Sequence, residues 1–195
     1  MKSQKKTRVR ERGQMSQIAI DCLWGTGWTS ALIGKFGFPQ GPSHCASVIV
    51  DVYNGKPRER YLDARDNEIA GVPPGVRIRE IASESFLKKQ RATLQVTPQE
   101  YADWEANLRA KVTTQYDRSA ILGFLEGKSM HTAGQWICSA LAVNAIQHIS
   151  RSWTSPHLGY IPFPLVVPAH EISPDALLLI LQTAGFTIGP ETTPA

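Results

Sequence analysis

The sequence lacks a long apolar run. Its longest run of apolar residues spans positions 176–181, far short of the roughly 20 residues that a membrane-spanning helix requires. Residues 15–21 are too short and too polar to form the apolar part of a secretion signal. We therefore expect a soluble protein with neither a signal peptide nor a membrane span.

The chain is also poor in cysteine and lacks the spacing of a metal site. Its three cysteines are an odd number without framework spacing, which favours reduced thiols: Cys22, Cys45 and Cys138. The five histidines form no HxxxH pair and the cysteines no CxxC pair, which argues against a zinc site. We therefore predict neither a metal nor a cofactor.

The net charge of +4 arises from the N-terminus. Residues 1–14 contain six Lys or Arg residues and one acidic residue, Glu11, which leaves 15 basic and 16 acidic residues in the rest of the chain. The body of the protein is therefore almost neutral. We expect residues 1–14 to form a disordered basic tail that binds nucleic acid weakly at most, or to precede a translation start at Met15.

The first half of the chain shows the signals of an antiparallel sheet. Residues 46–53 are rich in β-branched side chains with partial alternation, which is typical of a strand. Asn54-Gly55 is the dipeptide most typical of a two-residue hairpin turn. Three further stretches complete the predicted strands: residues 16–21, 58–64 and 76–81.

The second half of the chain is dominated by helix signals. Residues 97–100 (Thr-Pro-Gln-Glu) combine an N-cap Thr, a Pro at the first helical position and a Glu at the capping-box position. Apolar residues follow at helical spacing, which predicts an amphipathic helix over residues 98–112. A second helix is predicted to begin near Cys138, and a third to cover residues 173–181.

Loop-forming composition separates these elements. Residues 24–43 are rich in Gly and Pro and predict a loop, and residues 156–168 contain four Pro and predict extended chain. The order of strands and then helices indicates one α+β domain over residues 15–183, with a C-terminal tail at 184–195. We expect an antiparallel sheet or a small barrel packed against helices.

Three side chains occupy positions that suit a cysteine hydrolase. Cys138 lies where a loop runs into an apolar helical pattern, and a thiol at a helix N-terminus is easier to ionise. His44 precedes a predicted strand, and Asp63 lies on the returning strand of the hairpin, where cross-strand neighbours touch. These positions supply the parts of a catalytic triad, with Cys138 as candidate nucleophile, His44 as candidate base and Asp63 as the candidate residue that orients the base, but spacing alone does not carry the assignment.

Hydrogen-bond donors beside Cys138 would complete such a site, because acyl chemistry passes through an oxyanion. The backbone N–H of Cys138 is the first candidate, since amides in the first turn of a helix have no acceptor within it. Gln135 and Trp136, just upstream, are further candidates, and nothing in the sequence decides between them.

Each predicted role has a rival in the sequence. His131, seven residues before Cys138, competes for the role of base. Asp51 competes for the role of orienter, although its odd offset from His44 places it on the other face of a regular strand. Cys45 adjoins His44 and is expected to point into the core.

Three short motifs resemble those of the NlpC-type papain-like cysteine hydrolases. Residues 41–50 (GPSHCASVIV) resemble the strand that the catalytic His opens in that family. Residues 60–64 (RYLDA) resemble the next strand, whose third polar residue would here be Asp63. Residues 135–141 (QWICSAL) resemble the W/F-C-S-E-L segment of the circularly permuted YiiX/YebB-like branch, in which His precedes Cys as it does here.

Two further stretches look like features of the same branch: Tyr116-Asp117 and residues 172–175. The resemblance implies a permuted papain-like fold with the nucleophile at a helix N-terminus. It also implies cleavage of an amide bond through a thioester, with peptidoglycan peptides as the substrate. The source would be bacteria or their phages, with the protein in the cytoplasm of the bacterial or infected cell or in a virion.

Two other interpretations stay open. The branch is related to lecithin:retinol acyltransferase-like proteins, which implies acyl transfer or hydrolysis of lipid esters and thioesters as an alternative. Ala140 stands where the branch has Glu after Cys-Ser, which favours an inactive binding or virion-assembly module as a further alternative. The sequence does not determine the oligomeric state.

Overall fold

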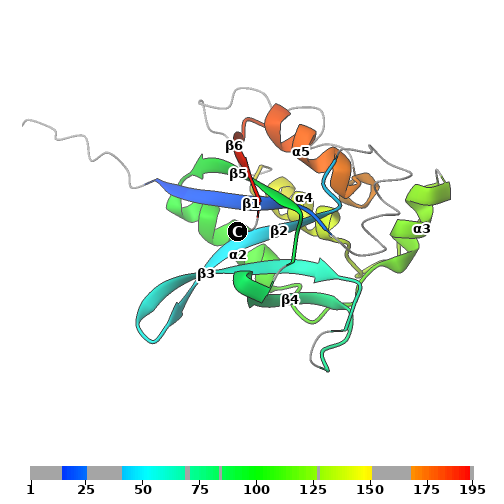
Figure 1. Ribbon diagram of the computed structural model, residues 1–195, viewed down its shortest axis with the longest axis horizontal. Coiled ribbons are helices and arrows are strands. Elements are labelled where there is room, and N and C mark those ends of the chain that lie inside the picture. The colour runs from blue at the N-terminus through cyan, green and yellow to red at the C-terminus, as the bar shows by residue number, and fades with distance from the viewer. Residues whose placement is uncertain are drawn as a thin grey trace, which may run out of the picture.

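The computed structural model of the protein describes residues 15–25, 41–68, 71–83, 85–126, 128–150 and 168–193. Its helices and strands form an α+β arrangement, as predicted (Figure 1). Three predictions lie outside the described residues: the basic tail at 1–14, most of the loop at 24–43, and nearly all of the extended chain at 156–168.

Six antiparallel strands form one sheet in the order β4-β3-β2-β1-β5-β6 (Figure 1). The strands are β1 (Ser16–Trp24), β2 (His44–Tyr53), β3 (Lys56–Arg65), β4 (Gly75–Glu80), β5 (Lys88–Val96) and β6 (Thr187–Thr192). Within the described residues, β4 and β6 are the two edges and do not pair with each other. The sheet is therefore open and does not close into a barrel.

The predicted hairpin joins β2 to β3. Asn54 and Gly55 have positive φ angles of 49° and 73°, as both central residues of a type I′ turn do. The ladder begins at the pair Tyr53–Lys56 and runs to Ser47–Leu62. The turn residues thus set which side chains of β2 and β3 lie opposite each other. In Figure 1 this hairpin extends away from the body of the molecule.

Four α-helices are found among the described residues: α2 (Pro98–Arg109), α3 (Arg118–Glu126), α4 (Cys138–Ser150) and α5 (Pro174–Thr183). Short 3₁₀ turns lie at η1 (Ile81–Ser83) and η3 (Ala169–Glu171). Helix α4 packs against α2 and against β2 and β3, and α5 packs against β2 and β5. The main core lies between this helical layer and one face of the sheet, and it includes Ile20, Ile49, Leu141, Ile146 and Leu177.

The opposite face of the sheet carries a second, smaller apolar cluster. It consists of Ala19, Leu23, Ala46, Val48 and Tyr61, with Ile81 and Phe86 packed against it. Both faces of the central strands are therefore buried, but by different means. One face is covered by helices, and the other by the chain around η1 and by polar side chains described below.

Three elements were not predicted from the sequence: β5, α3 and β6. Strand β6 pairs with β5, so the chain after residue 184 is not simply the tail that we expected. Its sequence (TIGPET) holds Gly and Pro, which are tolerated because this is an edge strand. Helix α2 also ends three residues earlier than predicted, in a turn where Thr113 has a φ angle of 75°.

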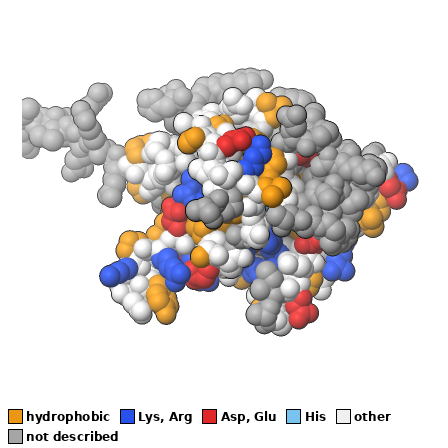
Figure 2. All heavy atoms as spheres, viewed as in Figure 1, with side chains coloured by type: hydrophobic (Ala, Val, Ile, Leu, Met, Phe, Trp, Pro, Cys, Tyr) orange, Lys and Arg blue, Asp and Glu red, His pale blue; other side chains and the backbone are white. Residues whose placement is uncertain are grey.

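The surface shows no large region of one charge on the face that Figure 2 presents. Basic and acidic side chains lie interspersed there, and several of them pair, as Arg58 does with Glu80 at 2.8 Å. Binding to a phosphate backbone needs a continuous basic surface, which this face does not offer among the described residues. No helix among the described residues has the length and apolar character to cross a membrane.

The capping box of α2 gives a first testable prediction. The Thr97 hydroxyl accepts from the Glu100 N–H at 3.2 Å, and the Glu100 carboxylate accepts from the Thr97 N–H at 2.8 Å. We expect Thr97→Ala to lower the free energy of unfolding by about 1 kcal/mol, because the cap acceptor is lost. Urea denaturation measures this, with Thr97→Ser, which keeps the hydroxyl, as the control. A loss of equal size in both variants would contradict the capping role.

Candidate active site

The hairpin brings His44 and Asp63 together. His44 is the first residue of β2, and the pairing of Ser47 with Leu62 places Asp63 on the same face of the sheet as His44. The imidazole Nε2 lies 2.7 Å from Asp63 Oδ2. The His44 side chain is 11% exposed and the Asp63 side chain is fully buried. This contact has the geometry that orients a histidine through one of its ring nitrogens.

Asp63 has a second partner that the sequence analysis missed. Arg79 on β4 donates from Nη2 to Asp63 Oδ2 at 2.6 Å, and its Nε lies 3.2 Å and 3.1 Å from the two carboxylate oxygens. Burial alone would raise the pKa of this carboxyl, but His44 and Arg79 together hold the pKa well below its usual range. Asp63 is therefore an ionised carboxylate although its side chain is fully buried.

A sequence signal for Arg79 did exist. Arg77 and Arg79 alternate with apolar residues in β4, so both point to one face of the sheet. The β3–β4 register pairs Asp63 with Arg77 and Tyr61 with Arg79, which puts both arginines on the face of Asp63. Arg77 instead donates to the backbone and side-chain oxygens of Asn67.

Cys138 is the first residue of α4, as predicted for a thiol at a helix start. Its sulfur is hydrogen-bonded by Cys45 and lies within the electrostatic reach of His44. The hydrogen bond from Cys45 and the positive charge of His44 outweigh burial and hold the pKa of Cys138 well below its usual range. The thiol is thus set up to ionise.

The pKa shift of His44 is consistent with the pKa shift of Cys138. Burial lowers the pKa of the imidazole, but the negative charge of Cys138 and the contact with Asp63 raise it to about 9. Since Nε2 is held by Asp63, Nδ1 is the ring nitrogen that remains for the sulfur. The two pKa shifts therefore both favour the thiolate–imidazolium form of the pair.

Cys45 has a larger role than the sequence suggested. It lies fully buried in the main core, as expected, and is the cross-strand neighbour of Cys22. Burial and the hydrogen bond to Cys138 raise its pKa well above the usual range. Cys45 therefore stays a neutral thiol that donates to the sulfur of Cys138. Alternation along β2 predicted its direction but not this contact, because α4 comes from much later in the chain.

The candidate oxyanion donors differ in their availability. The Trp136 N–H donates to the Gln115 carbonyl at 3.0 Å, and the Gln135 side chain donates to Gln115 Oε1, also at 3.0 Å. The Cys138 N–H opens α4 and has no acceptor within that helix. Among the three predicted donors, it is the one without an acceptor in the part of the chain that the structure describes.

Tyr116 is a further polar group near the sulfur. Burial and the charge of Cys138 raise the pKa of its phenol well above the usual range, so the hydroxyl stays protonated. A bridge between Tyr116 and Trp136 fixes this segment beside the start of α4. The sequence analysis singled out Tyr116 through the family resemblance alone.

The rival residues have partners outside this cluster. Asp51 binds Arg60 at 3.3 Å and also binds Arg109 of α2, which lies on the helical face of the sheet. His131 Nδ1 lies 2.6 Å from Asp117 Oδ2, and its ring stacks on His170 with centroids 4.4 Å apart.

A surface pocket of about 280 Å³ adjoins this histidine stack. It is lined by Ala120, Gly123, Lys128, Ser129, Met130, His170 and Glu171. None of the predicted catalytic residues lines it, so the pocket and the Cys138 cluster are separate features of the described structure.

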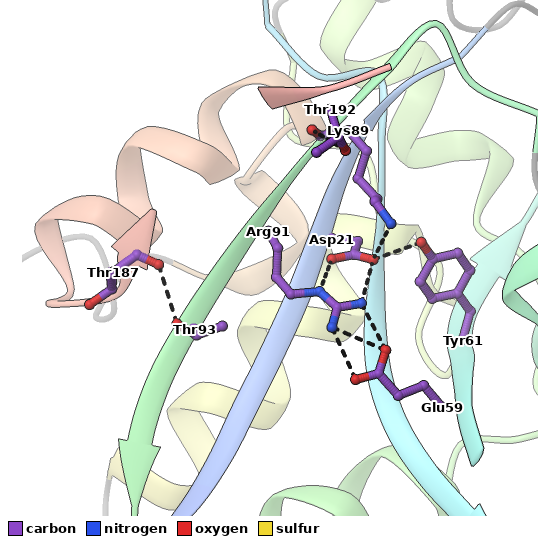
Figure 3. Close-up of polar contacts among 8 residues, drawn as sticks. All are labelled: Asp21, Glu59, Tyr61, Lys89, Arg91, Thr93, Thr187 and Thr192. Carbon is purple, nitrogen blue, oxygen red and sulfur yellow. Dashed lines mark hydrogen bonds and ion pairs between the residues drawn. The ribbon is translucent and has the colours of Figure 1, made fainter. Parts of the chain in front are cut away.

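A second polar network covers the sheet face that lies away from the helices (Figure 3). Asp21 is fully buried and accepts from the Tyr61 hydroxyl at 2.7 Å and from Arg91 Nε at 2.7 Å. Arg91 also binds Glu59 at 3.0 Å, and Lys89 lies 3.6 Å from Asp21. Tyr61 connects this network to Arg79, whose guanidinium lies 4.9 Å from the ring centroid.

No group of three or more His, Cys, Asp or Glu side chains in the described parts of the chain is arranged to hold a metal ion. Comparisons of the chain with protein-family models, with curated proteins and with solved structures found no match. The side chains around Cys138, His44 and Asp63 are therefore the basis for a functional proposal.

Proposed function

We propose that the protein is a cysteine hydrolase of the permuted papain-like kind, with Cys138 as nucleophile, His44 as base and Asp63 as orienter. The contact between His44 Nε2 and Asp63 Oδ2 at 2.7 Å, together with the hydrogen bond between the side chains of His44 and Cys138, supports the proposal. A nucleophile, a base and an orienting carboxylate in contact are the parts that covalent acyl chemistry requires.

The first half-reaction begins from the thiolate–imidazolium pair. The Cys138 sulfur attacks the substrate carbonyl carbon, and the C=O electron pair moves to the oxygen. In this proposal the N–H of Cys138 and the phenol of Tyr116 donate to that oxyanion. When the tetrahedral intermediate collapses, the C–N bond breaks and His44 gives its proton to the leaving amine. A thioester on Cys138 remains.

The second half-reaction uses the neutral imidazole. His44 takes a proton from water as the water oxygen attacks the thioester carbonyl. The C–S bond then breaks, the acid is released, and the His44 proton again balances the charge of the thiolate. Asp63 keeps the imidazole in one tautomer and orientation through both steps, and it does not itself exchange a proton.

We propose an amide bond of a peptidoglycan peptide as the substrate, on the strength of the sequence motifs. The direct test is incubation of the protein with purified muropeptides, followed by mass spectrometry of the products. We expect cleavage that falls in proportion to the fraction of Cys138 alkylated by iodoacetamide. Hydrolysis of lipid esters but not of muropeptides would identify acyl chemistry instead. Absence of both activities in the folded protein would contradict the proposal.

A further inference from the structure

Asp63 binds two basic side chains at once, those of His44 and Arg79. Its side chain is fully buried, with the imidazole of His44 on one side and the guanidinium of Arg79 on the other. Arg79 reaches both carboxylate oxygens through two nitrogens. This fork fixes the plane of the carboxylate, and with it the direction in which Oδ2 meets His44.

Arg79 is itself held in place. Its side chain is 9% exposed, and the guanidinium lies over the Tyr61 ring. The Tyr61 hydroxyl in turn donates to Asp21 (Figure 3). The arginine is therefore positioned by stacking and by the carboxylate together, and neither contact depends on substrate.

The charge around Asp63 explains why a second cation matters. A buried carboxylate with one partner protonates more easily than one with two. If Asp63 became neutral, the imidazolium of His44 would lose its counterion, and the thiolate of Cys138 would be protonated at a higher pH. The charged and titratable groups around Asp63 and its two partners are His44 and Cys45 on β2, Tyr61 and Arg65 on β3, Arg77 and Arg79 on β4, and Cys138 on α4.

We propose that Arg79 is a positioning residue that keeps Asp63 ionised and aimed at His44, so that the thiolate–imidazolium pair persists in acid. The inference rests on the proposed roles of Cys138 and His44, but its test does not need a substrate. Arg79 touches no reacting atom and acts through Asp63.

The test is the rate of alkylation of Cys138 by iodoacetamide between pH 3.5 and 8, followed by mass spectrometry of the Cys138 peptide. In the wild type we expect the alkylation rate to be constant through neutral pH and to fall at acid pH. In Arg79→Met we expect that fall to begin at least about one pH unit higher, which is the shift typical of removing a charge next to a buried acid. Circular dichroism at each pH checks that the variants are folded.

Arg91→Met is the matched control. Arg91 is also a partly buried arginine that binds a fully buried aspartate on the same sheet face, but it does not contact Asp63. We expect the alkylation rate of Cys138 in Arg91→Met to fall over the same acid pH range as in the wild type. An equal shift in both variants would show a general loss of packing and would overturn the role of Arg79.

Arg79→Lys covers the case in which Arg79→Met does not fold. Lysine keeps the positive charge but cannot form the two-pronged contact, so we expect a smaller shift in the same direction. An unchanged acid-side fall in a folded Arg79 variant would overturn this inference alone. A wild type whose alkylation rate rises tenfold per pH unit, like an ordinary thiol, would instead contradict the proposed function.

Discussion

Muropeptide hydrolysis by Cys138→Ala is expected to fall at least about 10³-fold below that of the wild type, because removal of a covalent nucleophile leaves only binding and oxyanion stabilisation. The methyl group of alanine fills less of the site than the thiol but leaves the start of α4 intact. The measurement is product formation per mole of protein under conditions that are linear in time, for both proteins.

Cys22→Ala is the control for this result. Cys22 is also a fully buried cysteine of the main core, on the strand next to Cys45, but burial raises its pKa far above the usual range. It therefore stays an inert thiol. We expect Cys22→Ala to keep activity within a few-fold of the wild type once the folded fraction is taken into account. Comparable activity in Cys138→Ala and wild type would remove Cys138 from the mechanism.

Asp63→Asn is expected to lower the free energy of unfolding by about 3–5 kcal/mol, because it leaves the buried guanidinium of Arg79 without a counter-charge. Chemical denaturation of both proteins at pH 7 measures the difference. The matched control is Asp51→Asn, since Asp51 also has two arginine partners but is 24% exposed. Its expected loss is about 1 kcal/mol, because solvent reaches this partly exposed side chain and screens its ion pairs.

A double variant tests whether the loss of stability comes from leaving one charge of the pair buried without its partner. Asp63→Leu combined with Arg79→Met removes both charges and fills the space with apolar side chains. We expect it to recover much of the stability that either single variant loses, because no unpaired charge is left buried. Additive losses in the double variant would show that Asp63 and Arg79 do not act as a pair.

The same pair makes stability depend on acid. The folded-state pKa of Asp63 is held below its unfolded value, so its contribution is complete above the unfolded pKa of about 3.9 and is lost as pH falls toward the folded value. We expect the stability difference between wild type and Asp63→Asn to be constant from about pH 5 to about pH 6, below the range in which His44 titrates, and to narrow below about pH 5. A difference that stayed constant down to pH 2 would contradict the ionised state of Asp63.

Local signals in the sequence were sufficient for much of this fold. Asn54-Gly55 predicted the hairpin, and the residues before α2 predicted its capped start, because the causes of both structures lie within a few residues. The contact between His44 and Asp63 followed from the hairpin once its turn was recognised. These are the parts of the fold and of the site that local sequence patterns can predict.

Most of the elements and contacts that were not predicted from the sequence depend on contacts between residues that are distant in the chain. Strand β5 begins with the polar residues Lys-Lys-Gln-Arg. It nevertheless lies inside the sheet, because Arg91 forms an ion pair with the buried Asp21 on β1. Helix α3 is an exception, because its start does carry a local signal that the sequence analysis did not use: Asp117 accepts from the Ala120 N–H at 3.1 Å. The Cys45–Cys138 and Asp63–Arg79 contacts likewise join separate elements, so no pattern within one element predicted them.

The order of the strands has a consequence for how the protein matures. His44, Asp63 and Arg79 come from three consecutive strands, β2 to β4, which pair as immediate neighbours, and such short-range pairings form early in folding. Cys138 arrives from α4, far later in the chain. A newly made chain therefore holds an ordinary, weakly nucleophilic thiol until the helix docks. Under the proposed mechanism, Cys138 would therefore become reactive only once the tertiary structure is complete.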